Sequence, residues 1–156
     1  MLLRHIPDFC LQYDQALGIL RLEWVSGADV RGLRTSARKL LALLQELPVH
    51  HLLLDMNTVP DLPLADQLWL GKHWMPGLVA SPLVHLVLAI DGNRIHNQLA
   101  IDALHDLVQP AIRFESHYFS DSASAFDWLA DNSEQLPVLV AEWNARHASA
   151  TPLAGE

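Results

Sequence analysis

The spacing of hydrophobic residues changes repeatedly along the chain, and each change separates a predicted strand from a predicted helix. Alternating apolar and polar residues at 9–13, followed by the run 17–24, predict an antiparallel hairpin that turns at 14–16. Further along, apolar steps of three and four residues predict amphipathic helices, and short continuous apolar runs predict strands covered on both faces. These helices are expected within 26–48, 64–74, 93–108, 122–130 and 137–146, and the further strands at 52–54, 84–90 and 112–119.

The order of these segments predicts an α/β fold. Strands that alternate with helices favour right-handed crossovers and a mainly parallel sheet, and the opening hairpin adds at least one antiparallel strand. We therefore expect a mixed, mainly parallel sheet with an N-terminal antiparallel hairpin and with helices packed on the sheet. The 156 residues fit one domain, which we place at 1–147, and the small, polar, proline-containing end at 148–156 is expected to be a flexible tail.

Local patterns give sharper expectations about the helices. Ser26 followed by Asp29 fits a capping box and predicts a helix start. Pro76-Gly77 is expected to stop or kink the preceding helix, and Glu142 and Arg146 have the spacing of an i,i+4 ion pair. Apolar residues spaced by four predict the buried face of the helix at 93–108, namely Ile95, Leu99, Ala103 and Leu107.

Composition narrows the class of protein. Hydrophobic residues make up 51% of the chain and charged residues 18%, which excludes a disordered chain. The net charge of −8 argues against a general nucleic-acid binder, and the single cysteine, Cys10, cannot form an intrachain disulfide. The longest clean apolar run, 86–90, is far shorter than the about 20 residues of a membrane span. With no span, no secretory start and an unpaired thiol, we expect a cytoplasmic protein.

Uneven charge favours an interaction surface. The first 40 residues carry six basic and four acidic residues, and the acidic excess lies in the remainder. The apolar face of the first predicted helix is flanked by Arg31, Arg34 and Arg38. These arginines form either a solvated stripe or a docking face for an acidic surface. Trp69 and Trp74 belong to the core or, if exposed, to a partner surface. We expect a homodimer, and a separate protein partner is an open alternative.

Polar residues follow two of the predicted buried strands. Ligands in open α/β sheets favour the carboxyl ends of strands. There the chain has Asp55 and Asn57 after one strand and Asp91, Asn93 and Arg94 after the next. If the two strands are neighbours, these side chains share one edge and could bind a polar ligand, hold a cation or act as an acid and a base. The alternative is that the Asp and Asn side chains cap a helix and accept hydrogen bonds from loop amides.

No complete catalytic or metal-binding motif occurs in the sequence. Gly27 and Gly32 have the glycine spacing of a phosphate loop, but the Lys and Ser/Thr that such a loop needs are missing. Asp55 is only partly similar to the aspartates of phosphatase and receiver loops, because their further acidic residues are absent. The nine histidines include no H-E-x-x-H or H-x-x-x-H spacing, and His50 and His51 would point to opposite faces of a strand. We therefore expect no enzyme activity, no cofactor and no metal.

The succession of segments is typical of one known group of proteins. The chain begins with a predicted hairpin that ends at Trp24 and continues with a capped helix. Then come the strand end Leu52-Leu53-Leu54-Asp55 and a strand at 84–90, which precedes a long helix. The strand end Phe119-Ser120-Asp121 and the short helix containing 125–129 complete the pattern. Over roughly residues 9–131 the chain resembles the STAS / SpoIIAA-like group, most of all its small stand-alone bacterial members.

The resemblance implies a non-enzymatic protein-interaction or regulatory module. In the best-known members, which antagonise anti-sigma factors, a serine at the start of the helix after the Asp-ended strand is phosphorylated. Here Leu64-Ala65-Asp66 replace the Ser-Gly of that switch and Thr58 lies too early, so the usual serine phosphoswitch is not expected. Distant relatives with CRAL-TRIO-like folds carry lipids, which implies an alternative function. This is a small-molecule or lipid carrier with an apolar pocket reached past Trp69, Trp74 or Pro76.

Overall fold

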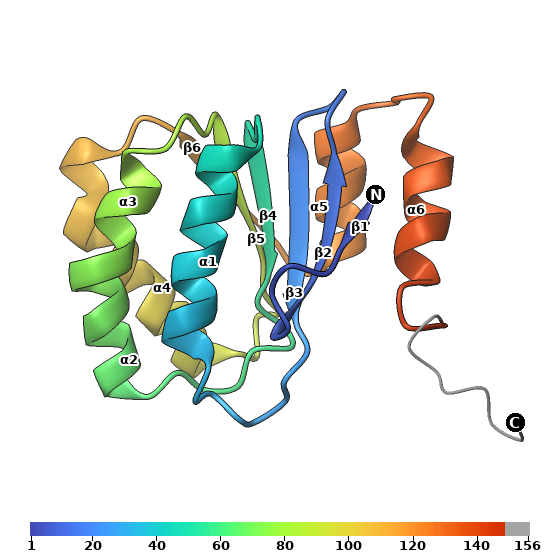
Figure 1. The fold of residues 1–156 in the computed structure, drawn as a ribbon. Helices are drawn as coiled ribbons and strands as arrows, with labels where there is room; N and C mark the ends of the chain where they lie inside the picture. Colours follow the sequence, from blue (N-terminus) through green and yellow to red (C-terminus); the bar gives the residue numbers. More distant parts are fainter. Residues whose placement is uncertain (149–156) are drawn as a thin grey trace, which may run out of the picture.

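Within residues 1–148, six strands form one sheet in which the spatial order is the same as the order along the chain (Figure 1). The computed structural model describes residues 1–148, so the expected tail lies, apart from Ala148, outside the described residues. The first three strands pair antiparallel and the last four pair parallel, which confirms the predicted mixed sheet and hairpin. The strands are β1 (Leu2–Leu3), β2 (Phe9–Asp14), β3 (Ile19–Trp24), β4 (His51–Asp55), β5 (His85–Ala89) and β6 (Glu115–Phe119). The short β1 is additional to the predicted strands.

Helices cover both faces of the sheet. They are α1 (Leu33–Glu46), α2 (Leu64–Trp69), the π-helical turn η1 (Leu70–Trp74), α3 (Met75–Val79), α4 (Ile95–Val108), the 3₁₀ turn η2 (Gln109–Ala111), α5 (Ser122–Ala130) and α6 (Leu136–Asn144). Among the described residues, none of these helices combines the length and apolar character that crossing a bilayer requires.

The strand order explains which helix covers which face. Every parallel crossover moves to the next strand in the same direction, and right-handed crossovers then place all the connecting helices on one side. α1, α2 to α3, and α4 lie together on this side, called here the crossover face (Figure 1). α5 and α6 follow the last strand and cover the other side, called here the C-terminal face.

Strand β3 shows how differently the two faces are built. Successive side chains of a strand point to opposite faces. Leu20, Leu22 and Trp24 join the main apolar core on the crossover face. Arg21 and Glu23, which alternate with them, are each only 4% exposed. The crossover face is therefore an apolar core, whereas the C-terminal face contains buried charges that need partners.

Helices α5 and α6 bring partners to the buried charges. Arg21 Nε donates to Ser122 Oγ at 2.9 Å, and its guanidinium lies 4.3 Å from the centre of the Trp143 ring. Burial, followed by the nearby Arg146 charge, lowers the pKa of Arg21 to about 10. The Glu23 carboxylate accepts two hydrogen bonds from the Arg146 guanidinium, at 2.5 and 3.1 Å. This bidentate pair fixes the chain just after α6 to the end of strand β3.

The predicted pairing of Glu142 with Arg146 is wrong. Arg146 turns inward to Glu23, because the buried carboxylate offers it a less solvated and therefore stronger partner. Glu142 instead contacts the amino group of Met1 at 2.8 Å and accepts from Gln12 Nε2 at 3.0 Å. Both ends of the described chain thus meet at α6.

The predicted capping box at Ser26 is also wrong. α1 begins only at Leu33, and the Ser26 hydroxyl donates to the Asp8 carboxylate. The same carboxylate accepts from Ser36 Oγ, in the first turn of α1, at 2.5 Å. An acid from a distant segment therefore provides the negative charge that favours a helix N-terminus.

The Pro76-Gly77 pair does not stop the second crossover helix. The chain passes from α2 through η1 into α3 and stays helical to Val79. Pro76 lies in the first turn of α3, where the missing N–H is tolerated. The irregularity is the π-helical turn that precedes the proline.

The buried face of α4 differs from the predicted one. Ile95, Leu99 and Leu107 are 63%, 64% and 62% exposed. Asn97 is fully buried, because its Oδ1 accepts from the Leu62 amide at 3.0 Å and its Nδ2 donates to the Pro60 carbonyl at 3.0 Å. These hydrogen bonds to the loop before α2 rotate α4 so that the apolar stripe faces outward.

The Glu23 and Arg146 pair should carry much of the stability of the C-terminal face. Arg146→Met leaves the Glu23 carboxylate buried without its main partner, and we expect a loss of about 3 kcal/mol in the free energy of unfolding. Urea unfolding of the full chain measures the loss. Arg31→Met is the matched control, because the ion pair of Arg31 with Asp29 is solvent-exposed and its loss should not be measurable. Equal stability of the two variants would contradict this account.

Candidate functional site

An apolar cavity of about 130 Å³ lies between the sheet and the helices of the crossover face. Its walls come from the sheet and from the helical segments α1, η1 with α3, and α4, so residues distant in sequence meet there. Most of the lining is aliphatic or aromatic. The main lining residues are Leu22, Leu54, Leu86, Leu88 and Phe114 from the sheet side, Ala37 and Leu40 from α1, Leu70, Trp74, Met75 and Leu78 from η1 and α3, and Ile101 and Leu104 from α4.

The π-helical turn forms one wall of this cavity. η1 contributes Leu70 and Trp74, and both side chains are 8% exposed. The indole Nε1 of Trp74 donates to the Ala37 carbonyl of α1 at 2.7 Å, which fixes the ring between two helices. π-helical turns are rare and recur at functional sites, because the extra residue redirects side chains. Here the turn directs Trp74 into the space under the helices.

A few polar groups reach the cavity from its margin. Asp55, His105 and Tyr118 contribute to the lining and are partly or largely exposed. Ser116, on β6, is different, because its Oγ is buried and has no hydrogen-bond partner among the described residues. A buried hydroxyl without a partner costs free energy, so Ser116 is a candidate contact for a polar atom of a bound molecule.

The predicted site at the carboxyl ends of the strands is a set of loop contacts. β4 and β5 are neighbours, as the hypothesis required. Asn57 joins the two loops, because its Oδ1 accepts from the Asp91 amide at 2.7 Å and its Nδ2 donates to the Ser120 carbonyl at 3.0 Å. Asp55 accepts from the Asn57 amide at 2.9 Å, and Asp91 accepts from the Asn93 amide at 3.1 Å. These contacts match the alternative in which the side chains stabilise turns.

Arg94 also makes a loop contact. Its guanidinium donates to the Val59 carbonyl, which ties the start of α4 to the loop after β4. A pocket at the carboxyl ends of β5 and β6 includes none of the predicted site residues, since its lining is Ile90, Gln98, Ile101, Asp102, Tyr118, Phe119 and Ser120. Ligand crevices in doubly wound sheets form where the strand order reverses, and no reversal occurs between the described strands.

The residues predicted to contact a partner occupy different environments. Arg31 is exposed beside Asp29, and Arg34 Nε contacts Asp66 Oδ1 at 2.8 Å. The guanidinium of Arg38 lies 4.9 Å from the centre of the half-buried Trp69 ring. Trp74, which lines the cavity, is buried and therefore adds little to the exposed surface. The structure therefore separates the two tryptophans that the sequence placed together.

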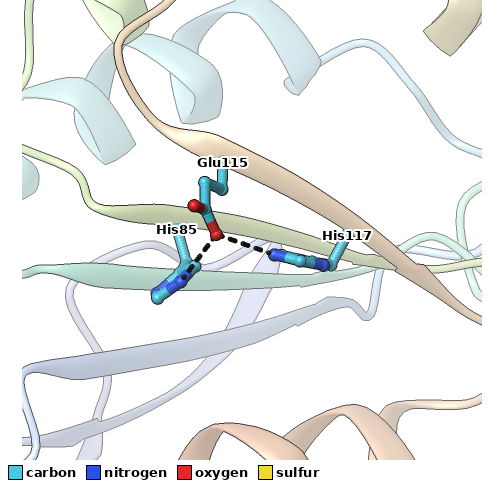
Figure 2. Close-up of side chains that lie close together, drawn as sticks. All are labelled: His85, Glu115 and His117. Atoms are coloured by element: carbon cyan, nitrogen blue, oxygen red, sulfur yellow. Dashed lines mark hydrogen bonds and ion pairs between the residues drawn. The ribbon is translucent and has the colours of Figure 1, made fainter.

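A second group of chemically active side chains lies on the C-terminal face. His85 of β5 and Glu115 and His117 of β6 converge at the amino ends of these strands (Figure 2). Glu115 Oε2 lies 3.4 Å from His85 Nε2 and 3.3 Å from His117 Nε2. On the other side of His85, its Nδ1 lies 2.8 Å from the Nδ1 of His51, at the start of β4.

Strand register brings this histidine group together. His51, His85 and Glu115 are direct neighbours across three parallel strands, and His117 follows Glu115 on the same face. Burial, reinforced by the nearby His85 and His50, lowers the pKa of His51. The linear spacings contain no metal motif, so sequence reasoning missed the group. The available signal was the position of a histidine at the start of two predicted neighbouring strands.

The comparisons with known proteins add no family assignment. No family model, curated protein or solved structure matches this chain. The resemblance to the STAS / SpoIIAA-like group therefore stays a prediction.

The half-buried position of Asp55 leads to a pH-dependent prediction. Burial raises the pKa of Asp55, although the hydrogen bond from Asn57 acts in the opposite direction. The folded protein therefore favours the protonated carboxyl, and ionised Asp55 lowers stability at pH 7. Asp55→Asn keeps the acceptor for the Asn57 amide and removes the charge, so we expect a larger free energy of unfolding at pH 7.

This gain should shrink as the pH falls through the pKa of Asp55, because the wild-type carboxyl then becomes neutral as well. Urea unfolding at pH 7 and near pH 4 measures the two differences. Asp61→Asn, at an exposed position, is the matched control and should change little at either pH. A loss of stability in Asp55→Asn at pH 7 would show that the charge is required in the folded state.

Proposed function

We propose that this protein is a non-enzymatic binding module that holds a small, mainly apolar molecule in the cavity of the crossover face. The observation that carries the proposal is the cavity of about 130 Å³ with its apolar lining. Protein cores are close-packed, so a void of this size forfeits contacts that a bound molecule would recover. An apolar cavity of about 150 Å³ is large enough to bind benzene. A molecule of this size therefore fits without rearrangement of the helices.

The lining also indicates the chemistry of the molecule. Trp74, Met75 and several leucines offer apolar and polarisable contacts, which suit an aromatic ring or a branched aliphatic group. Ser116 offers one hydroxyl that lacks a hydrogen-bond partner among the described residues. The favoured ligand class is a small apolar molecule with a single hydroxyl or carbonyl group. This develops the carrier function that the sequence left as an alternative.

Phenol and toluene test this proposal as a matched pair, because they have nearly the same shape and phenol has a hydroxyl group where toluene has a methyl group. Both should raise the melting temperature of the full chain, and calorimetry should give phenol the higher affinity. In Ser116→Ala the preference should fall by about 5-fold, which corresponds to one hydrogen bond of about 1 kcal/mol. Ser116→Leu should fill the cavity and abolish binding of both probes.

Ser124→Leu is the control for Ser116→Leu, because it adds the same side chain at an exposed position on α5. It should bind both probes like the wild type. Native mass spectrometry of gently purified protein should also retain an additional small mass, which is lost in Ser116→Leu. If neither probe binds the wild-type chain, or if Ser116→Leu binds them unchanged, the cavity is not the binding site.

A specific observation favours a second role, association with a second copy of the chain. Ile95, Leu99 and Leu107 expose an apolar stripe along α4. Leu64 and Leu68 of α2 are 68% and 67% exposed, and the two helices are joined at their surface by the contact of Gln67 with His96. Exposed apolar patches of this kind mark interaction sites. We propose this surface as the contact of a homodimer, in agreement with an interaction module.

Light scattering tests the homodimer. At tens of micromolar the wild-type chain should have the mass of a dimer, and Leu99→Lys should be a monomer because a charge in an apolar interface is not solvated. Val138→Lys is the matched control, since Val138 is 64% exposed on α6, far along the chain from the stripe. A wild-type monomer, or a dimer that Leu99→Lys does not weaken, would rule this surface out.

A further inference from the structure

The histidine group on the C-terminal face contains the donor set of a metal site. Two imidazole nitrogens and one carboxylate oxygen, from His85, His117 and Glu115, all lie within 4.8 Å of one another (Figure 2). Two histidines and one glutamate are a set that binds zinc with a fourth position left for water or substrate. The three residues come from adjacent strands, which hold their backbones at a fixed separation.

The distances within the group suit a zinc-type ion. Glu115 Oε2 lies 3.4 Å from His85 Nε2 and 3.3 Å from His117 Nε2. In a tetrahedral site with bonds of about 2.0–2.1 Å, two donor atoms are about 3.3 Å apart. Two of the three donor separations thus already match. The remaining one closes by rotation of the His117 side chain, which is 35% exposed.

Ion pairing alone gives little reason for this convergence. The Glu115 side chain is 72% exposed, and exposed ion pairs contribute only about 0–1 kcal/mol. Such pairs do not hold several imidazole rings together against their own side-chain entropy. A bound cation would provide the missing attraction.

The surroundings of the group resemble the outer contacts of metal sites. A histidine ligand usually donates its second ring N–H to a neighbouring acceptor, which fixes the ring and its tautomer. His85 has such a neighbour, because the Nδ1 atoms of His85 and His51 are 2.8 Å apart and the two ring planes are inclined by only 26°. The Trp128 ring of α5 packs against both histidines, because its ring centre lies 4.5 Å from that of His117 and 5.6 Å from that of His85. One side of the group is therefore covered, and the side of Glu115 is open.

We propose that His85, Glu115 and His117 form a binding site for Zn²⁺ or a similar divalent transition-metal ion, with His51 as a positioning residue. The ion is held by His85 Nε2, His117 Nε2 and the Glu115 carboxylate, and the fourth position faces solvent. The site is on the opposite side of the sheet from the apolar cavity and does not depend on it.

Titration of the full chain with ZnCl₂ tests the site. Isothermal calorimetry should show one Zn²⁺ bound per chain. Co²⁺ should give the strong visible absorption of a tetrahedral ion with nitrogen and oxygen ligands. Glu115→Gln and His117→Ala should abolish both signals, and circular dichroism checks that these partly exposed substitutions leave the fold intact. His73→Ala, at an exposed position on η1 outside the group, is the control and should bind like the wild type.

The positioning role of His51 has its own variants. His51→Ala should weaken Zn²⁺ binding by about 10- to 100-fold, the usual effect of losing an outer contact. His51→Asn keeps an acceptor near the same place and should restore much of the affinity. Absence of Zn²⁺ and Co²⁺ binding to the wild type would overturn the site. Unchanged binding in Glu115→Gln and His117→Ala would overturn it as well, because the ion would then be held elsewhere.

Discussion

The strands of this sheet lie side by side in the order in which they occur along the chain, and this order constrains where every helix can lie. Right-handed crossovers that always advance in one direction leave their helices on one face. The other face receives only the helices that follow the last strand (Figure 1). The fold therefore has α1 to α4 on one side of the sheet and α5 and α6 on the other.

The two layers create two different chemical environments. On the crossover face, α4 is oriented by the buried Asn97, and an apolar cavity remains between the sheet and the helices α1, α3 and α4. On the C-terminal face, α5 and α6 cover Arg21 and Glu23 and supply their partners. α5 ends beside the amino ends of β4 to β6, and the histidine group there stays within reach of solvent. Both candidate sites are consequences of how the helices are distributed.

Sequence patterns predicted the elements well where the pattern reflects burial of a continuous face. The strands at 9–13 and 84–90 and the helix at 122–130 are present close to their predicted bounds, because alternation and helical spacing directly record which side chains avoid water. The patterns failed where a polar group distant in the sequence formed the decisive hydrogen bond or ion pair. Asp8 accepts the hydrogen bond of Ser26, and Glu23 forms an ion pair with Arg146. The hydrogen bond that Asn97 accepts from the Leu62 amide orients α4 so that its apolar stripe faces outward. Local spacing contains no information about such partners.

The sequence by itself determined the class of fold, the hairpin and the alternation of strands and helices, since these follow from hydrophobic period and from the geometry of a single chain segment. Only the tertiary structure decided which polar residues meet. His51, His85 and Glu115 are separated by long stretches of chain and become neighbours through parallel register. The cavity likewise depends on the fit between helices and sheet. The physical reason is that contacts between distant segments depend on how whole elements pack, which no local pattern records.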